Sequence, residues 1–203
     1  MARHDRSRRE DDGITLMEVL VAMSLFTLVL VVFVDAVRIM TGSLSRVSAT
    51  SASVTQSRAA ADVLGRQLAY ASAANLPYYD SARSTWYFEF ESDATKAGSD
   101  SSCTQWRYQS SGLLQYRTWS VVTLLATGWT TVTSTLANDP ATQPPFTLLP
   151  SDTGFSVMRV GVDLRVRTAA GNLVQNQGQY TLRNSLEAPV PTTSTVCTQL
   201  GRP

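Results

Sequence analysis

Side chains able to do acid–base, nucleophilic or metal chemistry are scarce in this chain. It has a single histidine, His4, and only two cysteines, Cys103 and Cys197. Ser-His-Asp and Cys-His catalysis and most zinc sites need a histidine placed beside other reactive groups. No phosphate-binding loop or dinucleotide-binding glycine pattern is present in the sequence. We therefore expect a protein that is not an enzyme and that holds no cofactor.

Two other groups of residues could form binding sites. Asp93, Ser99 and Asp100 lie in one polar segment and could hold a calcium ion, but they lack the order of a calcium-binding loop, and a solvated loop is the simpler interpretation. Four tryptophans could form a binding platform, although their alternation with polar residues favours a place in the core: Trp86, Trp106, Trp119 and Trp129.

The charge balance excludes sequence-independent binding to nucleic acid. The chain of 203 residues has 17 Lys and Arg against 16 Asp and Glu, so its net charge is +1. Without a basic surface there is no means of neutralising a phosphate backbone, and we expect no direct contact with nucleic acid. The length allows one domain with appendages.

The N-terminal part of the chain has the composition of a membrane anchor. Residues 1–13 are polar and contain four arginines, whereas residues 14–34 are apolar except for two threonines, one serine and Glu18. A helix of that length extends for about 31 Å, enough to cross a bilayer core of about 30 Å. Because the basic cluster precedes the helix, the sequence predicts a cytoplasmic segment 1–13, a transmembrane helix over 14–36 and the rest of the chain outside the cytoplasm.

The acidic residue inside this apolar run carries a more specific hypothesis. The stretch Gly13-Ile14-Thr15-Leu16-Met17-Glu18-Val19 resembles the processing signature of type IV pilins and type II secretion pseudopilins. The resemblance implies that a prepilin peptidase cuts between Gly13 and Ile14 and methylates the new amine. It also implies that Glu18 neutralises the Ile14 amine of a neighbouring subunit in a filament, so that the partners are other pilin or pseudopilin subunits, the peptidase and, before assembly, membrane lipid.

The chain departs from that family pattern at two positions, and the second departure, at Asp35, favours a minor subunit over the main one. The first residue after the cleavage site is Ile14 rather than the usual Phe, and Asp35 stands where major pilins often have a helix-bending Pro. A weaker resemblance to J-type minor pseudopilins and W-type minor pilins lies in residues 58–68 and 106–117. Two alternatives remain open: a cleaved secretory signal ending near Val34-Asp35-Ala36, and an uncleaved signal anchor that carries an extracytoplasmic binding or adhesion domain.

Beyond the membrane segment, the period of the apolar residues predicts a longer helix. No proline occurs before Pro77, and residues 37–75 are expected to continue the helix as an amphipathic segment. Its apolar stripe follows helical spacing: Val37, Met40, Leu44, Val47, Val54, Ala61, Leu64 and Leu68. We expect this stripe to pack on the downstream sheet, with a coiled-coil dimer as the alternative.

From Thr85 onward the period changes to two, which is typical of strands. Residues 80–187 are expected to form an antiparallel sheet with one buried and one wet face, and residues 188–203 a Pro-rich extended tail. The clearest predictions within this region are a hairpin over 104–119, a strand over 157–167 with a return strand over 179–184, and loops over 92–102 and 136–154. The fold class is α+β, a long N-terminal helix packed on an antiparallel sheet, as in the pilin-like resemblance.

The two cysteines would both lie outside the cytoplasm, where disulfides persist. Cys103 and Cys197 allow only one pairing within the chain, and closing a loop of roughly 95 residues would stabilise the fold by about 4–5 kcal/mol. Two free thiols, or pairing between chains, remain the alternatives.

Overall fold

The computed structural model describes residues 15–93, 100–149, 154, 156–168, 171–185 and 196–197. It separates into two compact units, one up to Ser45 and the other from Arg46 on. The described residues combine one helix with antiparallel sheets, so the α+β prediction is confirmed.

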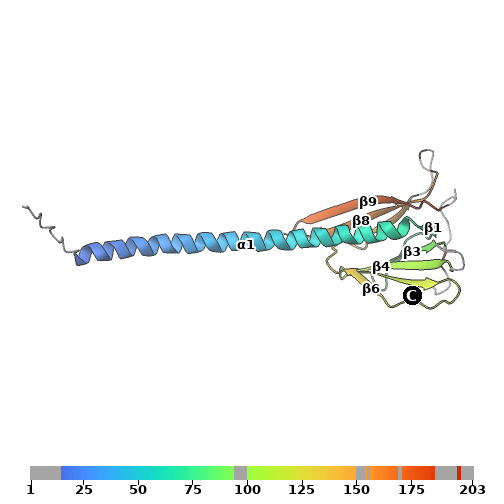
Figure 1. Cartoon of the computed structure of the whole chain (residues 1–203), viewed down its shortest axis with the longest axis horizontal. Coiled ribbons are helices and arrows are strands. Elements are labelled where there is room, and N and C mark those ends of the chain that lie inside the picture. Colours follow the sequence, from blue (N-terminus) through green and yellow to red (C-terminus); the bar gives the residue numbers. More distant parts are fainter. Residues whose placement is uncertain are drawn as a thin grey trace, which may run out of the picture. The chain divides into compact units, whose positions relative to one another are not determined.

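The helix α1 runs from Leu16 to Leu68 (Figure 1). Thr15 caps its start, because the backbone N–H of Glu18 donates to the Thr15 carbonyl at 2.9 Å and to its Oγ1 at 3.4 Å. Gly42 and Gly65 lie within the helix and do not interrupt it.

The helix ends at Leu68 rather than at residue 75, because the last residues of the predicted helical segment 37–75 form a strand instead. After Leu68 a turn follows, and β1, Ala71–Ala74, pairs antiparallel with β3, Thr85–Ser92. Ala71 and Ala74 are fully buried there. The strand pairing and burial of these alanines outweigh their helix propensity, which is only a weak preference.

The first sheet has the strand order β1-β3-β4-β5-β6, with β2 also pairing with β3. Its further strands are β2 Tyr78–Asp80, β4 Ser102–Gln109, β5 Leu114–Ser120 and β6 Thr130–Thr133. The hairpin predicted over 104–119 is confirmed as β4 and β5. Gly112 closes it with a φ of +88°, and a Cβ there would lie 2.4 Å from the Leu136 carbonyl oxygen, so only glycine fits this turn.

The second sheet has the order β7-β8-β9, with bounds β7 Phe146–Leu149, β8 Arg159–Arg167 and β9 Leu173–Thr181. The strand predicted over 157–167 is confirmed, and its alternate residues from Val160 to Val166 are buried. Two predictions for this region were wrong. β9 begins at Leu173 rather than at 179, and β7 lies within the stretch 136–154 that was expected to be a loop, because its four residues are too few to show a period.

One hydrophobic core joins the end of α1 to both sheets (Figure 1). Its largest fully buried side chains are Trp106, Tyr108, Phe88, Phe90, Phe146, Leu64, Leu68, Leu114, Leu164 and Leu182. Of the predicted helix stripe, Ala61, Leu64 and Leu68 are buried in this core and Val54 packs against it. Val37, Met40, Leu44 and Val47 are exposed, so the expectation that the whole stripe packs on the chain's own sheet was wrong.

The first sheet also departs from the expectation of one wet face. Tyr87, Glu89 and Gln105 point away from the core, as the register with Phe88 and Trp106 requires, yet Tyr87 and Glu89 are each 2% exposed and Gln105 is fully buried. Other parts of the chain therefore cover the second face at its centre.

Candidate functional site

The helix from Leu16 to Val34 can serve as a membrane anchor. Every large apolar side chain in this stretch is exposed within the chain, from 38% at Val34 to 82% at Leu16. α1 is long and apolar enough to cross a membrane, and the stretch extends for about 28 Å. Such a surface is covered either by lipid or by other apolar helices.

The hydroxyl groups within this stretch are satisfied by the helix itself. Ser24 Oγ donates to the Val21 carbonyl at 2.8 Å, and Thr27 Oγ1 donates to the Met23 carbonyl at 2.7 Å. Such bonds let serine and threonine enter a bilayer without an unpaired polar group.

Glu18 is the exception in this stretch. It lies in the first turn of α1, in an apolar hollow shared with Val19, Ala22, Met23 and Phe26. No hydrogen bond or ion pair joins its carboxylate to another described residue. A carboxylate costs about 2.5–3.5 kcal/mol at the centre of a bilayer and less near an end. Glu18 is therefore the group in this segment that has most to gain from a partner.

The structure also shows a helix cap at Thr15 that the sequence analysis missed. The sequence has the Thr-x-x-Glu spacing of a capping box, but among the described residues only the half that Thr15 supplies is formed: its Oγ1 accepts the Glu18 backbone N–H, and the Glu18 carboxylate takes no part. That motif is visible in the sequence itself. Of the other predicted processing residues, Gly13 and Ile14 lie outside the described residues, so their placement beside Glu18 stays a prediction.

The apolar segment ends at a pair of charges. Asp35 and Arg38 approach to 4.0 Å with side chains that are 64% and 78% exposed. An exposed pair of this kind contributes little to stability. Its position instead marks the point beyond which the helix surface carries polar side chains again.

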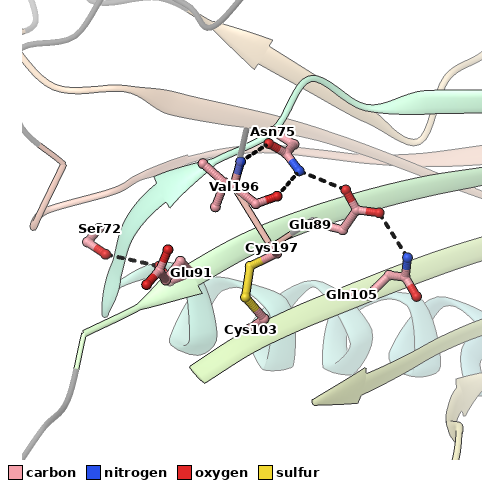
Figure 2. The surroundings of a disulfide bond; sticks show 8 residues. All are labelled: Ser72, Asn75, Glu89, Glu91, Cys103, Gln105, Val196 and Cys197. Atoms are coloured by element: carbon pink, nitrogen blue, oxygen red, sulfur yellow. Dashed lines mark hydrogen bonds between the residues drawn. A yellow bond between two sulfur atoms is a disulfide. The ribbon is translucent and has the colours of Figure 1, made fainter. Parts of the chain in front are cut away.

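The two cysteines form a disulfide that attaches the C-terminal residues to the first sheet. Cys103 lies on β4, and its Cα is 5.7 Å from that of Cys197 (Figure 2). Val196 is held by Asn75, whose Oδ1 accepts the Val196 N–H at 3.0 Å and whose Nδ2 donates to the Val196 carbonyl. The predicted pairing within the chain is therefore present.

The same asparagine connects this attachment to a buried carboxylate. Asn75 Nδ2 donates to Glu89 Oε2 at 2.9 Å, and Gln105 Nε2 donates to Glu89 Oε1 at 2.8 Å (Figure 2). Neutral amides thus satisfy both oxygens of Glu89. These two hydrogen bonds offset the free-energy cost of burying the carboxyl group, so its burial depends on Asn75 and Gln105.

The weaker binding-site hypotheses find no support in the geometry. Asp100 accepts a hydrogen bond from Ser120 Oγ at 3.0 Å, and Ser99 lies outside the described residues. In the described part of the chain, no group of three or more His, Cys, Asp or Glu side chains is placed to hold a metal.

The four tryptophans do not form one platform, because the strand register divides them between two faces. Trp86 and Trp106 share the core face with Phe88, whereas Trp119 lies opposite Cys103 on the other face. Trp129 lies on the same face as Trp119, with its ring over Arg107 and Arg117.

No protein-family model matches this chain, and neither does any curated protein or solved structure.

Proposed function

We propose that this chain is a structural subunit of the pilin-like class, a minor pilin or pseudopilin that is inserted in the membrane by α1 and then assembled into a filament. The observation that carries the proposal is Glu18, a carboxylate without a described partner in an apolar stretch whose serine and threonine side chains are satisfied by the helix backbone. The resemblance of residues 13–34 to prepilin signatures supports it.

In this proposal a prepilin peptidase removes residues 1–13, and the new amine of Ile14 becomes a cation near the membrane face. In a bundle of such helices, Glu18 of one subunit pairs with the Ile14 amine of the next. Breaking a buried ion pair by removing one partner costs about 3–5 kcal/mol, so the pair would set the register between subunits. The exposed apolar side chains of α1 would form the bundle core in place of lipid contacts.

Processing is tested by intact mass and N-terminal analysis of the protein from its native membrane. The proposal requires a chain that begins at N-methylated Ile14. A chain that begins at Met1 or Ala2, or one that begins near Val37, would contradict it.

The proposed charge-pairing role of Glu18 can be separated from the helix cap at Thr15 by two matched variants. Glu18→Gln keeps a residue suited to a capping box but removes the charge, whereas Thr15→Ala removes the cap and keeps the charge. We expect Glu18→Gln to remain in the membrane fraction and to be lost from filaments, and Thr15→Ala to be incorporated. Normal incorporation of Glu18→Gln would show that the charge is not used.

The second candidate is a signal-anchored extracytoplasmic binding domain. The anchor itself favours it, because a helix that is long and apolar enough to cross a membrane can hold the domain there without any second subunit. This candidate predicts that the chain keeps residues 1–13 and is unaffected by loss of the prepilin peptidase.

A further inference from the structure

Two arginines occupy neighbouring positions on the face of the first sheet that points away from the core. Arg107 on β4 lies opposite Gln115 on β5, and Arg117 on β5 lies opposite Gln105 on β4. The two guanidinium groups are therefore diagonal neighbours across one antiparallel pair, close enough for long side chains to interact.

Glutamine side chains hold both guanidinium groups in place. Arg107 donates from Nε at 2.8 Å and from Nη2 at 2.6 Å to Gln115 Oε1, and Arg117 donates from Nε at 2.8 Å to Gln105 Oε1. Arg107 also has a side-chain hydrogen bond with Tyr87, whereas no hydrogen bond to another described residue engages either Nη atom of Arg117. A guanidinium group that is fixed at Nε and has free Nη donors is suited to oxyanions, which it binds through paired hydrogen bonds.

Trp129 covers the pair. Its ring centroid is 3.9 Å from Cζ of Arg107 and 4.7 Å from Cζ of Arg117, and the Trp119 ring lies 5.8 Å from Cζ of Arg117. Stacking on an indole stabilises a guanidinium group and fixes its plane while leaving its edge open to a ligand.

Neither guanidinium has a carboxylate within ion-pair distance in the described part of the chain. Arg83 and Arg165, in contrast, each approach an aspartate to 2.8 Å. The difference appears in the pKa directions. Hydrogen bonds to Asp80 and Asp163 raise the pKa of Arg83 and Arg165, whereas burial lowers the pKa of Arg107 and Arg117.

The nearest acid on this face, Glu89, compensates the pair only in part. Its charge favours the protonated form of Arg117, as does the neighbouring Tyr87, but burial is the largest influence on that arginine. Both Glu89 oxygens already accept hydrogen bonds from amides, and Gln105 stands between Glu89 and Arg117. The sheet thus holds two partly desolvated cations and leaves them without a direct counter-charge.

The loop that brings Trp129 over the arginines also exposes an apolar tip. Val122, Leu124 and Leu125 are 68%, 40% and 78% exposed, and Leu124 has a φ of +55°, which is strained for a side chain of this size. Exposed apolar residues beside aromatic and arginine side chains have the composition of a protein–protein contact.

We propose that the face formed by Arg107, Arg117 and Trp129 is a docking site for a carboxylate-bearing segment of a partner protein, with the Val122–Leu125 tip as its apolar flank. Charge complementarity selects the partner, because two cations without a direct counter-charge attract an acidic segment and repel a basic one. A nucleic-acid backbone fits poorly, since binding it needs more cations than this pair supplies. The proposal is independent of the filament role.

Binding is tested with the full chain in uncharged detergent, using an oligo-glutamate peptide as the probe. We expect saturable binding at low salt that shifts the NMR signals of the Arg107 and Arg117 Nε–H groups and of the Trp129 indole. This readout needs no variant. Absence of saturable binding, or binding that shifts other arginines instead, overturns the proposal.

Variants give a second test. Arg107→Gln with Arg117→Gln is expected to weaken peptide binding by about tenfold or more, while the control pair Arg46→Gln with Arg58→Gln removes the same charge from exposed helix positions and leaves binding unchanged. Near-UV circular dichroism checks the fold of each variant. Equal losses in both pairs, or binding of an oligothymidylate probe with the same dependence on Arg107 and Arg117, would overturn the assignment to an acidic protein segment.

Discussion

The two units of this chain treat apolar side chains in opposite ways. Up to Ser45, every large apolar side chain of α1 is exposed, whereas from Arg46 on, the end of the helix and two sheets bury most of theirs in a common core, with Val47 and the Val122–Leu125 tip among the exceptions. The first unit therefore depends on lipid or on other helices to cover it. The second has its own core, a disulfide and a buried polar network, which are the features of a domain stabilised from within.

That contrast predicts where substitutions affect the stability of the second unit. Each of the following changes is expected to lower it by a mechanism that the first unit lacks. All can be measured by chemical unfolding followed through tryptophan signals, with the chain kept in detergent.

The largest expected effect comes from the disulfide. Cys103→Ser leaves residues 196–197 held only by the hydrogen bonds between Val196 and Asn75, and opening a cross-link of 94 residues is expected to cost about 4–5 kcal/mol of unfolding free energy. Reduction of the unchanged protein should have the same effect. A loss below about 1 kcal/mol would show that this cross-link constrains the unfolded chain very little.

The next prediction compares the loss of unfolding free energy when a buried aromatic side chain of the core and an exposed one of the N-terminal helix are each truncated. Trp106 is fully buried and donates from Nε1 to Gln67 Oε1 at 2.8 Å, so Trp106→Ala is expected to cost about 3–5 kcal/mol. Phe26 in the first unit is 65% exposed, and Phe26→Ala should change the unfolding free energy by less than about 0.5 kcal/mol. Similar losses for both variants would contradict the division into two units.

A smaller effect is expected from the polar network on the covered sheet face. Asn75→Ala removes the groups that hold Val196 and one Glu89 oxygen, and we expect a loss of about 1–3 kcal/mol. Asn184→Ala is the matched control, because Asn184 is exposed and makes one long hydrogen bond of 3.5 Å to the Tyr70 carbonyl. If the two variants are equally stable, the network around Glu89 does not stabilise the fold.

The smallest effect is the acid dependence of a single ion pair. The Arg83 side chain lowers the pKa of Asp80 through a hydrogen bond and its charge. A carboxyl group with a lowered folded-state pKa stabilises the fold above its unfolded pKa of about 4 and loses that contribution as the pH falls further. Asp80→Asn should therefore show a smaller decrease in urea midpoint between about pH 6 and about pH 3 than the unchanged chain. An unchanged decrease would assign the acid dependence to other groups.

Prediction from the sequence succeeded where the spacing of apolar residues stays regular over a long segment whose apolar side chains share one environment. The apolar run of α1, the alternation in β8 and the hairpin of β4 and β5 each repeat over enough residues to identify a helix or a strand. It failed for β1 and β7, which have four residues each, and at the helix end, where alanines that suit a helix pair with β3 instead.

The sequence by itself determined the membrane-compatible helix, the α+β class and the single pairing open to its two cysteines within the chain, because these follow from composition and local periodicity. Only the tertiary structure decided that Glu89 is buried among amides, and that Arg107 and Arg117 meet beneath Trp129 without a direct carboxylate partner. These residues come from neighbouring strands of the first sheet and from the loop that precedes β6. Their proximity depends on strand register and on which segment covers a sheet face, and neither is encoded in the pattern of any one segment.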